Sequence, residues 1–344
     1  MARTAWVLAL RGVADGPMGI TLDVLGAVTR IVKSGLVPAR EVLRPSVVSI
    51  DGRSAKSAMG RTVDVDLALK KVRPNKRDVV IVPGLGFSTP REIDEGLARA
   101  DVREAARWLG DEGARAGLRC ASCSATFVLA ASGALDGGEA TTTWWLGPAF
   151  AQRFPRIALR QDRMVVASGG VLTAGSAFAH ADLVLSIVGR ALGPSLSQLA
   201  ARYLVLDERP SQARYMVRSQ VRTSDPAILA VERAVLGALD ETLTIERLAH
   251  AAHTSPRTLA RRFRDVLGTT PLRFVHGMKM EHASHLLETT SESVEAIAGR
   301  VGYADPAAFR RIFLRETGRR PRELRARPVG SAPLPGRTRR FTRT

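Results

Sequence analysis

The spacing of hydrophobic residues divides the chain at about residue 205. Before it, short β-branched apolar runs alternate with longer segments of helical periodicity. The predicted strands are residues 6–10, 47–50, 79–82, 118–121 and 164–167, and the predicted helices include residues 22–32, 90–100, 102–112, 124–132 and 177–192. This alternation predicts an α/β fold, a three-layer sandwich in which helices cover both faces of a mostly parallel sheet.

Beyond residue 226 the periodicity is only helical. Residues 227–239 form a predicted packing helix, and Thr244 is the expected N-cap of a short helix over residues 245–251. Ser255 followed by Pro256 starts a second helix, which runs to Leu267 and is closed by Gly268. A short helix, a tight turn and a second helix form a helix-turn-helix unit.

The same arrangement then repeats. Pro271 starts a long connecting helix with an apolar flank at Leu272, Val275, Met278, His282 and Leu286–Leu287. Ser293 begins a short helix over residues 294–301, Gly302 and Tyr303 make the turn, and Asp305 with Pro306 starts the last reading helix. The two reading helices start 50 residues apart, so they are expected to enter successive major grooves on one face of DNA.

Each reading helix has an apolar face and an opposite face on which DNA contacts are expected. In the first, Leu259, Phe263 and Leu267 recur every four residues and are expected to face the core, as are Phe309, Ile312 and Phe313 in the second. Arg257 and Arg261 are the predicted base readers, and Arg262 and Arg264 the phosphate contacts. The full set of predicted DNA-contacting residues is Arg257, Thr258, Ala260, Arg261, Arg262, Arg264, Ala307, Ala308, Arg310 and Arg311.

Charge supports this interpretation. The net charge is +18, and residues 222–344 hold 22 Lys and Arg against 13 Asp and Glu, a net +9, whereas the other 221 residues share the remaining +9. A cluster of cations favours phosphate binding through counterion release. The alternative is a generally arginine-rich composition with solvated surfaces. Two cysteines and the lack of an apolar run near 18 residues favour a cytoplasmic protein without a membrane segment.

These patterns predict four regions. Residues 1–205 form the α/β domain, and residues 206–226 form a polar, proline-containing linker. Residues 227–327 form the all-α domain of two helix-turn-helix units, and residues 328–344 form a basic tail too poor in apolar residues to fold.

The helical domain resembles the DNA-binding domain of AraC/XylS-family regulators over residues 227–325. The first unit carries Ile245-x-x-Leu248-Ala249, Ser255-x-Arg257-x-Leu259-x-Arg261-x-Phe263 and Gly268-Thr269-Thr270-Pro271. The second carries Val294-x-x-Ile297-Ala298-x-x-Val301-Gly302-Tyr303, Phe309-x-Arg311-x-Phe313 and Gly318-x-x-Pro321. The resemblance implies sequence-specific binding of double-stranded DNA. Family members usually have polar residues where this chain has Pro306, Ala307 and Ala308, so the first unit is expected to supply most of the base specificity.

The N-terminal region contains a candidate nucleophile at Cys123. Residues 118–130 predict a strand, a sharp turn at Cys123 and a helix, which is the arrangement of a nucleophile elbow. The stretches 118–130, 132–137, 140–144 and 172–175, with Asp182-Leu183, resemble the class I glutamine amidotransferase-like domains of the ThiJ/PfpI group, and more narrowly the version at the N-terminus of GlxA-type AraC regulators. The resemblance implies a flavodoxin-like fold over roughly residues 4–200.

The catalytic base that such a cysteine needs is not found in the sequence. Proteolytic members of the group have a His after the cysteine, where this chain has Ser124, and the regulator branch often has a His before the tryptophan, where this chain has Thr143. The remaining His of this region, His180, lies on a predicted helix with no partner motif. We therefore expect Cys123 to be a vestigial nucleophile in an effector-binding or dimerisation domain, without a catalytic site, metal or cofactor.

The expected effector pocket combines Gly84, Leu85, Gly86, Cys123, Ser124 and Thr143. The expected protein is a transcriptional regulator and a homodimer that binds DNA, a small-molecule effector and RNA polymerase. The alternative is a cysteine-dependent amidotransferase-like or isonitrile hydratase-like enzyme with a DNA-binding appendage. A redox switch at Cys120-x-x-Cys123 is a further alternative, although Cys120 falls within the predicted strand. The Trp144-Trp145 pair is interpreted equally as core or as part of a ligand site.

Overall fold

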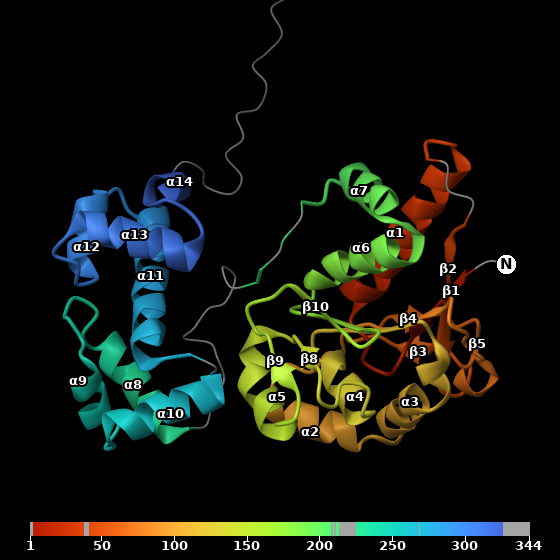
Figure 1. The fold of residues 1–344 in the computed structure, drawn as a ribbon, viewed down its shortest axis with the longest axis horizontal. Coiled ribbons are helices and arrows are strands. Elements are labelled where there is room, and N and C mark those ends of the chain that lie inside the picture. Colours follow the sequence, from red (N-terminus) through yellow and green to blue (C-terminus); the bar gives the residue numbers. More distant parts are fainter. Residues whose placement is uncertain are drawn as a thin grey trace, which may run out of the picture. The chain divides into compact units, whose positions relative to one another are not determined.

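The structure, a computed structural model, describes residues 3–37, 41–207, 209, 211–212, 225–267 and 269–325. The chain divides into two compact units (Figure 1). One contains all the strands and the helices up to residue 203, and the other contains Pro226–Arg261 and, from Thr269, the remaining helices. Most of the predicted linker and all of the predicted basic tail lie outside the described residues.

A seven-stranded sheet forms the centre of the first unit, in the order β10-β11-β7-β6-β1-β2-β5. All neighbours pair in parallel except β10 and β11, which are antiparallel. Its strands are β1 (Arg3–Leu8), β2 (Leu43–Ser49), β5 (Leu67–Ala68), β6 (Val79–Val82), β7 (Leu118–Ser122), β10 (Val165–Ser168) and β11 (Val171–Ala174). Two short pairs complete the strands: β3 (Ala55–Lys56) with β4 (Thr62–Val63), and β8 (Glu139–Ala140) with β9 (Ala158–Leu159).

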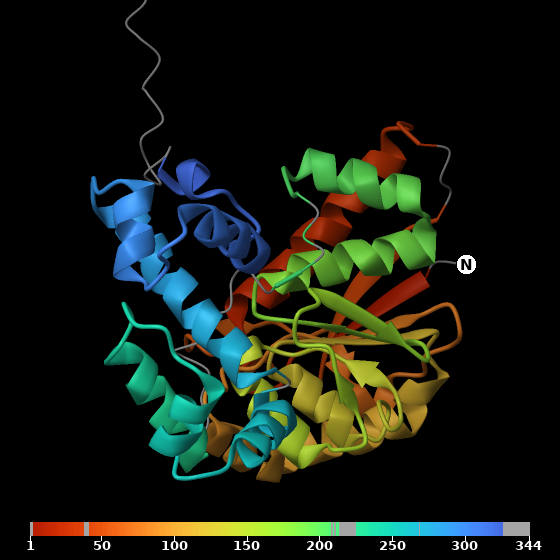
Figure 2. The same cartoon turned by 60° about the vertical axis from the view of Figure 1, so that its left-hand side comes forward.

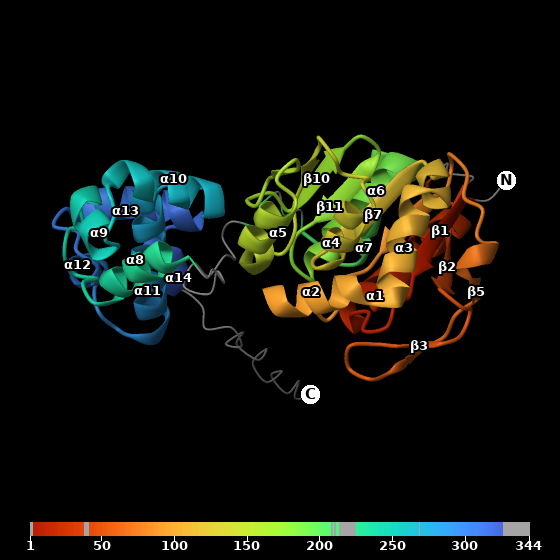
Figure 3. The same cartoon turned by 90° about the horizontal axis from the view of Figure 1, so that it is seen from below.

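Helices cover both faces of this sheet (Figures 1 and 3). One buried cluster joins the sheet to α1 (Asp15–Lys33), α6 (Ala179–Leu192) and α7 (Pro194–Tyr203). A second cluster joins it to α2 (Pro90–Ala98), α3 (Ala100–Gly110), α4 (Ala125–Ala131) and α5 (Gly147–Arg153). The three-layer α/β fold with a mostly parallel sheet is therefore confirmed.

The predicted elements of this unit are largely confirmed, with shifts at their ends. Val79–Val82 has the predicted bounds because a polar segment precedes it and Pro83 follows it. The prediction for the first strand was placed too late, since β1 covers Arg3–Leu8, and α1 begins seven residues before its predicted start. Strand β11 and helices α5 and α7 were not among the predicted elements. Val171–Ala174 follows β10 after only a two-residue turn, which hides the boundary in the sequence pattern.

From Pro226 onward, the described part of the chain contains seven helices and no strand (Figure 2). They are α8 (Pro226–Leu236), α9 (Ile245–Ala251), α10 (Pro256–Leu267), α11 (Pro271–Thr289), α12 (Val294–Arg300), α13 (Pro306–Thr317) and α14 (Pro321–Arg325). The predicted pair of helix-turn-helix units is present as α9–α10 and α12–α13. The long α11 joins them.

Local capping explains most of these helix starts. The side chains of Thr244, Ser293 and Asp305 each accept hydrogen bonds from backbone amides in the first turn of the following helix, as predicted. Two details of the prediction are wrong. Helix α8 ends at Leu236, before Gly237, so Leu239 is not helical. Leu272 is 41% exposed, whereas Val275, Met278, Leu286 and Leu287 of the predicted flank are buried.

No helix in the described ranges combines the length and the apolar character that a membrane crossing requires.

Candidate functional site

Cys123 occupies the sharp turn between β7 and α4. Its φ is 54°, in the left-handed region that non-glycine residues rarely adopt. The backbone amide of Cys123 donates to the carbonyl oxygens of Ala174 and Gly175, at 3.1 and 2.8 Å, just after β11. The strained turn is therefore held by the neighbouring strand, and the geometry is that of a nucleophile elbow.

The glycine loop that follows β6 lies directly beside this turn. A Cβ atom on Gly84 would stand 3.1 Å from the Cβ of Cys123, so the two backbones approach closely. The Ser124 hydroxyl donates to the carbonyl oxygen of Leu85 at 2.6 Å, and the Leu85 amide donates back to that hydroxyl at 3.1 Å. The structure thus brings Gly84, Leu85, Cys123 and Ser124 together at the carboxyl ends of adjacent parallel strands, where open α/β sheets bind ligands.

The third segment at the elbow is the threonine loop, residues 141–143, all of which are buried. The Thr142 hydroxyl donates to the carbonyl oxygen of Cys123 at 2.7 Å. Burial raises the pKa of the Cys123 thiol, and the hydrogen bond from the Ser124 amide opposes this shift only partly. Cys123 is 7% exposed, and because its pKa is raised above the usual thiol value the side chain stays protonated at neutral pH.

His180, the histidine of this unit, uses both of its ring nitrogens to contact hydroxyl groups rather than the thiol. Its Nδ1 is 2.8 Å from the Ser122 hydroxyl, and its Nε2 is 2.7 Å from the Thr21 hydroxyl. Burial lowers the pKa of the His180 ring to about 3. The ring is neutral, and both of its nitrogens are occupied.

The other candidate residues near the elbow are Cys120, the Trp144–Trp145 pair and Gly86. Cys120 is fully buried within β7, as its place in the predicted strand indicated, and burial raises the pKa of its thiol. Trp144 is 7% exposed and makes an edge-to-face pair with the partly buried Trp145, with ring centroids 5.2 Å apart. Gly86, by contrast with Gly84, is exposed.

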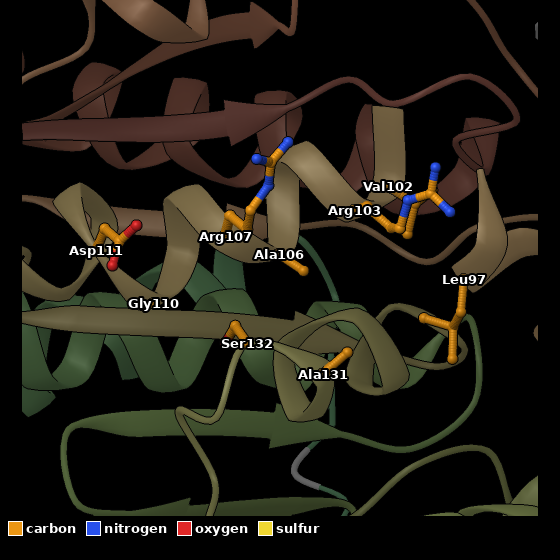
Figure 4. Close-up of a pocket in the computed structure, with 9 residues that line it drawn as sticks. All are labelled: Leu97, Val102, Arg103, Ala106, Arg107, Gly110, Asp111, Ala131 and Ser132. Atoms are coloured by element: carbon orange, nitrogen blue, oxygen red, sulfur yellow. The ribbon is translucent and has the colours of Figure 1, made fainter. Parts of the chain in front are cut away.

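Two hollows on this unit do not include any elbow residue. The larger, about 690 Å³, lies between α3 and α4 (Figure 4). The exposed side chains of Arg103 and Arg107 extend from α3 at its edge, while Ala131 and Ser132 form the side toward α4. The smaller, about 500 Å³, lies between α6 and α7 and includes Asp182 and Arg209. Neither hollow is lined by a cysteine or by the glycine loop that follows β6.

In the first helix-turn-helix unit, four arginines of α10 are exposed, and they fall into two groups. Leu259 and Phe263 are fully buried, as expected, whereas Leu267 is only partly buried. Among the described residues, Arg257, Arg261 and Arg264 make no ion pair or side-chain hydrogen bond. Arg262 differs, since its Nη1 lies 3.4 Å from both carboxylate oxygens of Asp225. Ala260 and Thr258 are half-buried, and the Thr258 hydroxyl accepts a hydrogen bond from Ser255.

In the described structure, helix α13 of the second unit exposes fewer arginines without an ion pair than α10 does. Phe309 and Phe313 are buried and Ile312 is half-buried. Asp305 accepts hydrogen bonds from the amides of Ala307 and Ala308, at 2.8 and 3.1 Å, so a carboxylate stands at the start of this reading helix. Ala307 is exposed and Ala308 half-buried. Arg310 pairs with Glu295 of α12, which leaves Arg311 as the exposed arginine of this face without an ion pair in the described structure.

A buried lysine that was not predicted from the sequence connects the two helix-turn-helix units. Lys279 of α11 is 4% exposed, and its Nζ donates to the carbonyl oxygens of Glu241, before α9, and Val301, after α12, at 2.6 and 3.0 Å. Its Nζ also lies 5.8 Å from the centre of the Tyr303 ring. Gly302, with φ 76°, leaves room for this arrangement, because a Cβ there would stand 2.8 Å from the lysine Nζ.

Comparison with known proteins assigns both parts of the chain to known families. Residues 5–190 match the DJ-1/PfpI family, and residues 248–327 match a helix-turn-helix domain. The chain is 31% identical over 217 residues to the HTH-type transcriptional regulator GlxA of Rhizobium meliloti (strain 1021), which covers 62% of this chain and 67% of the relative. It is 24% identical over 323 residues to the HTH-type transcriptional regulator GbdR of Pseudomonas aeruginosa (strain UCBPP-PA14), covering 91% and 84% of the two chains.

A solved structure supports the fold of the first unit alone. A crystallised protein from Vibrio parahaemolyticus, 18% identical, superposes with a TM-score of 0.50 and covers 59% of this chain and 100% of its own. The resemblances to the ThiJ/PfpI group and to AraC-type regulators are thus confirmed together, in relatives that share the order of the two parts. The chain belongs to the DJ-1/PfpI family, in the branch that carries an AraC-type helix-turn-helix domain, and it is a DNA-binding transcriptional regulator.

Proposed function

We propose that the DJ-1/PfpI domain of this regulator is a non-catalytic sensor, which binds a small-molecule effector around Cys123, and that α10 supplies most of the base recognition. The observation that carries the first part is the state of His180. Both of its ring nitrogens are hydrogen-bonded to hydroxyl groups away from the thiol, and its low pKa keeps it neutral. A cysteine nucleophile needs a base or a nearby cation to become a thiolate.

The effector site is proposed for the residues that converge on the elbow. Gly84, Leu85, Cys123 and Ser124 are in mutual contact, and Thr143 is part of the buried loop beside them. Gly86 is exposed at the outer end of the glycine loop. A neutral thiol, backbone amides and hydroxyl groups would suit a small polar molecule better than a strongly charged one.

The sensor assignment is tested by titrating the thiol and by assaying its chemistry. The ultraviolet absorbance of the thiolate should show no ionisation of Cys123 at neutral pH, with Cys123→Ala as the blank. Purified protein should also release no product from amide, ester or isonitrile substrates above the level of Cys123→Ala. A thiolate at neutral pH together with Cys123-dependent turnover would overturn the assignment.

The alternative, an enzyme of amidotransferase-like or isonitrile hydratase-like type, is favoured by one observation. Cys123 keeps the positive φ of an elbow, a strain that enzymes of this architecture use to expose the nucleophile. If Cys123→Ala abolishes a hydrolase or hydratase activity while DNA affinity and transcriptional output stay the same, the enzyme is the better description.

On DNA, we propose Arg257 and Arg261 as base readers, Arg264 and Arg262 as phosphate contacts, and Arg311 as the main contact of α13. The roles of Arg257, Arg261, Arg264 and Arg311 are supported by guanidinium groups that make no ion pair within the described structure. Arg262 and Arg310 would first have to leave Asp225 and Glu295. A homodimer, a contact with RNA polymerase and a cytoplasmic location are further parts of the proposal. They follow from the AraC-type resemblance and from the need to reach DNA.

A further inference from the structure

The chain that leaves the sensor domain is fixed to it at several points before residue 213. Arg209 forms an ion pair with Asp182 of α6 and donates to the carbonyl oxygen of Phe178 at 2.8 Å. The Ser211 hydroxyl and the Gln212 amide donate to the carbonyl oxygen of Asp162, at 2.7 and 3.0 Å. Residues 213–224, between this point and the DNA-binding domain, lie outside the described residues.

Gln212 is the most deeply inserted of these residues, with 1% of its surface exposed. Its side-chain nitrogen Nε2 contacts three oxygen atoms: the Gln161 carbonyl at 2.8 Å, the Thr141 hydroxyl at 3.0 Å and the Thr142 carbonyl at 3.1 Å. Its Oε1 has no hydrogen-bond partner within the described structure. Burying an amide oxygen without a hydrogen-bond partner costs free energy, which the three contacts of Nε2 must offset.

The same amide fits against Gly175, where no larger residue would leave room. A Cβ atom on Gly175 would stand 2.1 Å from the Oε1 of Gln212. Gly175 and Thr142, two of the residues that Gln212 contacts, also hold the backbone of Cys123, together with Ala174. The Gly175 carbonyl accepts from the Cys123 amide at 2.8 Å, and the Thr142 hydroxyl donates to the Cys123 carbonyl at 2.7 Å.

We infer that Gln212 is a positioning residue of the elbow site, supplied by the chain that leads to the DNA-binding domain. This inference rests on the sensor function proposed above. Gln212 couples the conformation of the elbow to that of the chain segment before residue 213. A molecule that displaces the threonine loop or Gly175 weakens the contacts that Gln212 makes with them. The chain segment before residue 213 is then held less firmly to the domain. By reciprocity, release of Gln212 loosens Cys123.

The test measures the elbow and the chain separately and needs no knowledge of the effector. Iodoacetamide is the probe of the elbow, since Cys123 is 7% exposed and Cys120 is fully buried. Trypsin is the probe of the chain, since Arg214, Arg218 and Arg222 follow Gln212 closely. Gln212→Ala is compared with the wild type and with Gln152→Ala, a matched change at an exposed glutamine of the same unit.

Gln212→Ala should raise the alkylation rate of Cys123 and the tryptic cleavage rate after Arg214 by about tenfold each, the factor expected for losing one or two buried hydrogen bonds. Gln152→Ala should change neither rate. Gln212→Glu keeps the size of the side chain but places oxygen against three acceptors, so it should behave like Gln212→Ala. Thermal melting of each variant checks that the domain is still folded.

Rates in both Gln212 variants equal to those of the wild type would overturn the inference. So would faster cleavage with an unchanged alkylation rate, because Gln212 would then hold only its own segment. The sensor proposal is judged by a different measurement, the DNA affinity of wild-type protein alkylated at Cys123. If both rates rise in the variants but alkylation leaves DNA affinity unchanged, Gln212 positions the elbow and the elbow does not control DNA binding.

Discussion

The two helix-turn-helix units share one plan but differ in the charges at their reading faces. Helix α10 starts at the neutral cap Ser255 and exposes Arg257, Arg261 and Arg264 without ion pairs in the described structure. Helix α13 starts at the acidic cap Asp305, has Ala307 and Ala308 in its first turn, and has one of its two central arginines paired with Glu295. An identical backbone plan therefore does not imply an equal share in recognition. The proposal that the first unit supplies most of the base recognition rests on this difference.

The comparison is tested most strongly by removing one free arginine from each unit. Arg261→Ala should weaken binding to the cognate site by about 1–3 kcal/mol, the value of a bidentate contact to a base, and should relax specificity at that position. Arg311→Ala is the matched change in α13, and its loss should be clearly smaller. Both are measured by titration of labelled cognate and random DNA.

Equal losses for Arg261→Ala and Arg311→Ala would show that the units share recognition equally. Equal losses on cognate and random DNA for Arg261→Ala would show that Arg261 contacts phosphate instead of a base.

The next largest effect is expected at the joint between the units. Lys279→Met keeps a long side chain but leaves the Glu241 and Val301 carbonyl oxygens without their donor, so unfolding should cost about 1–2 kcal/mol less. Affinity for the cognate site should fall more than affinity for random DNA, because only the cognate site needs both reading helices in register. Melting curves and the same DNA titrations check this. His285→Met, an exposed position of α11, is the control and should change neither.

The features that could be predicted from the sequence are those that depend on residues close together in the chain. Ser255-Pro256 and Asp305-Pro306 mark helix starts because a cap and a first-turn proline act within three residues, and the elbow at Cys123 is visible because strand, turn and helix are consecutive. Contacts between distant segments were not predictable. The pairing of Arg310 with Glu295, the burial of Lys279 and the insertion of Gln212 beside Gly175 depend on folds that bring together residues 15 to 71 positions apart.

The candidate base illustrates the same limit. The sequence shows that His180 is the histidine of the first unit, but not where its nitrogens point. Only the fold shows that they are bound to Ser122 and Thr21, 58 and 159 positions away. The presence of a histidine that could act as a base was therefore predictable from the sequence. Whether its nitrogens are free to take a proton from the thiol was not.

A smaller effect distinguishes phosphate contacts from base contacts within α10. Arg264→Ala should weaken binding to cognate and random DNA alike, by about 1 kcal/mol at low salt, and should lower the slope of affinity against salt concentration by about 1. The measurement is a salt series on both DNAs. Arg262→Ala is the informative companion, since Arg262 is near Asp225 and should change the slope less. A loss confined to cognate DNA would make Arg264 a base reader.

The smallest expected effect concerns the acidic cap of the second unit. Asp305→Ser gives α13 the same cap residue as α10, so the amides of Ala307 and Ala308 keep an acceptor and stability should change by only a few tenths of a kcal/mol. Removing a negative charge from the DNA side should strengthen binding to any sequence by less than about 0.5 kcal/mol, most visibly at low salt. Asp305→Asn, which also keeps the cap and loses the charge, should act in the same way. A loss of cognate affinity in both variants would instead mean that the carboxylate accepts a hydrogen bond from a base, and α13 would then be a reader in its own right.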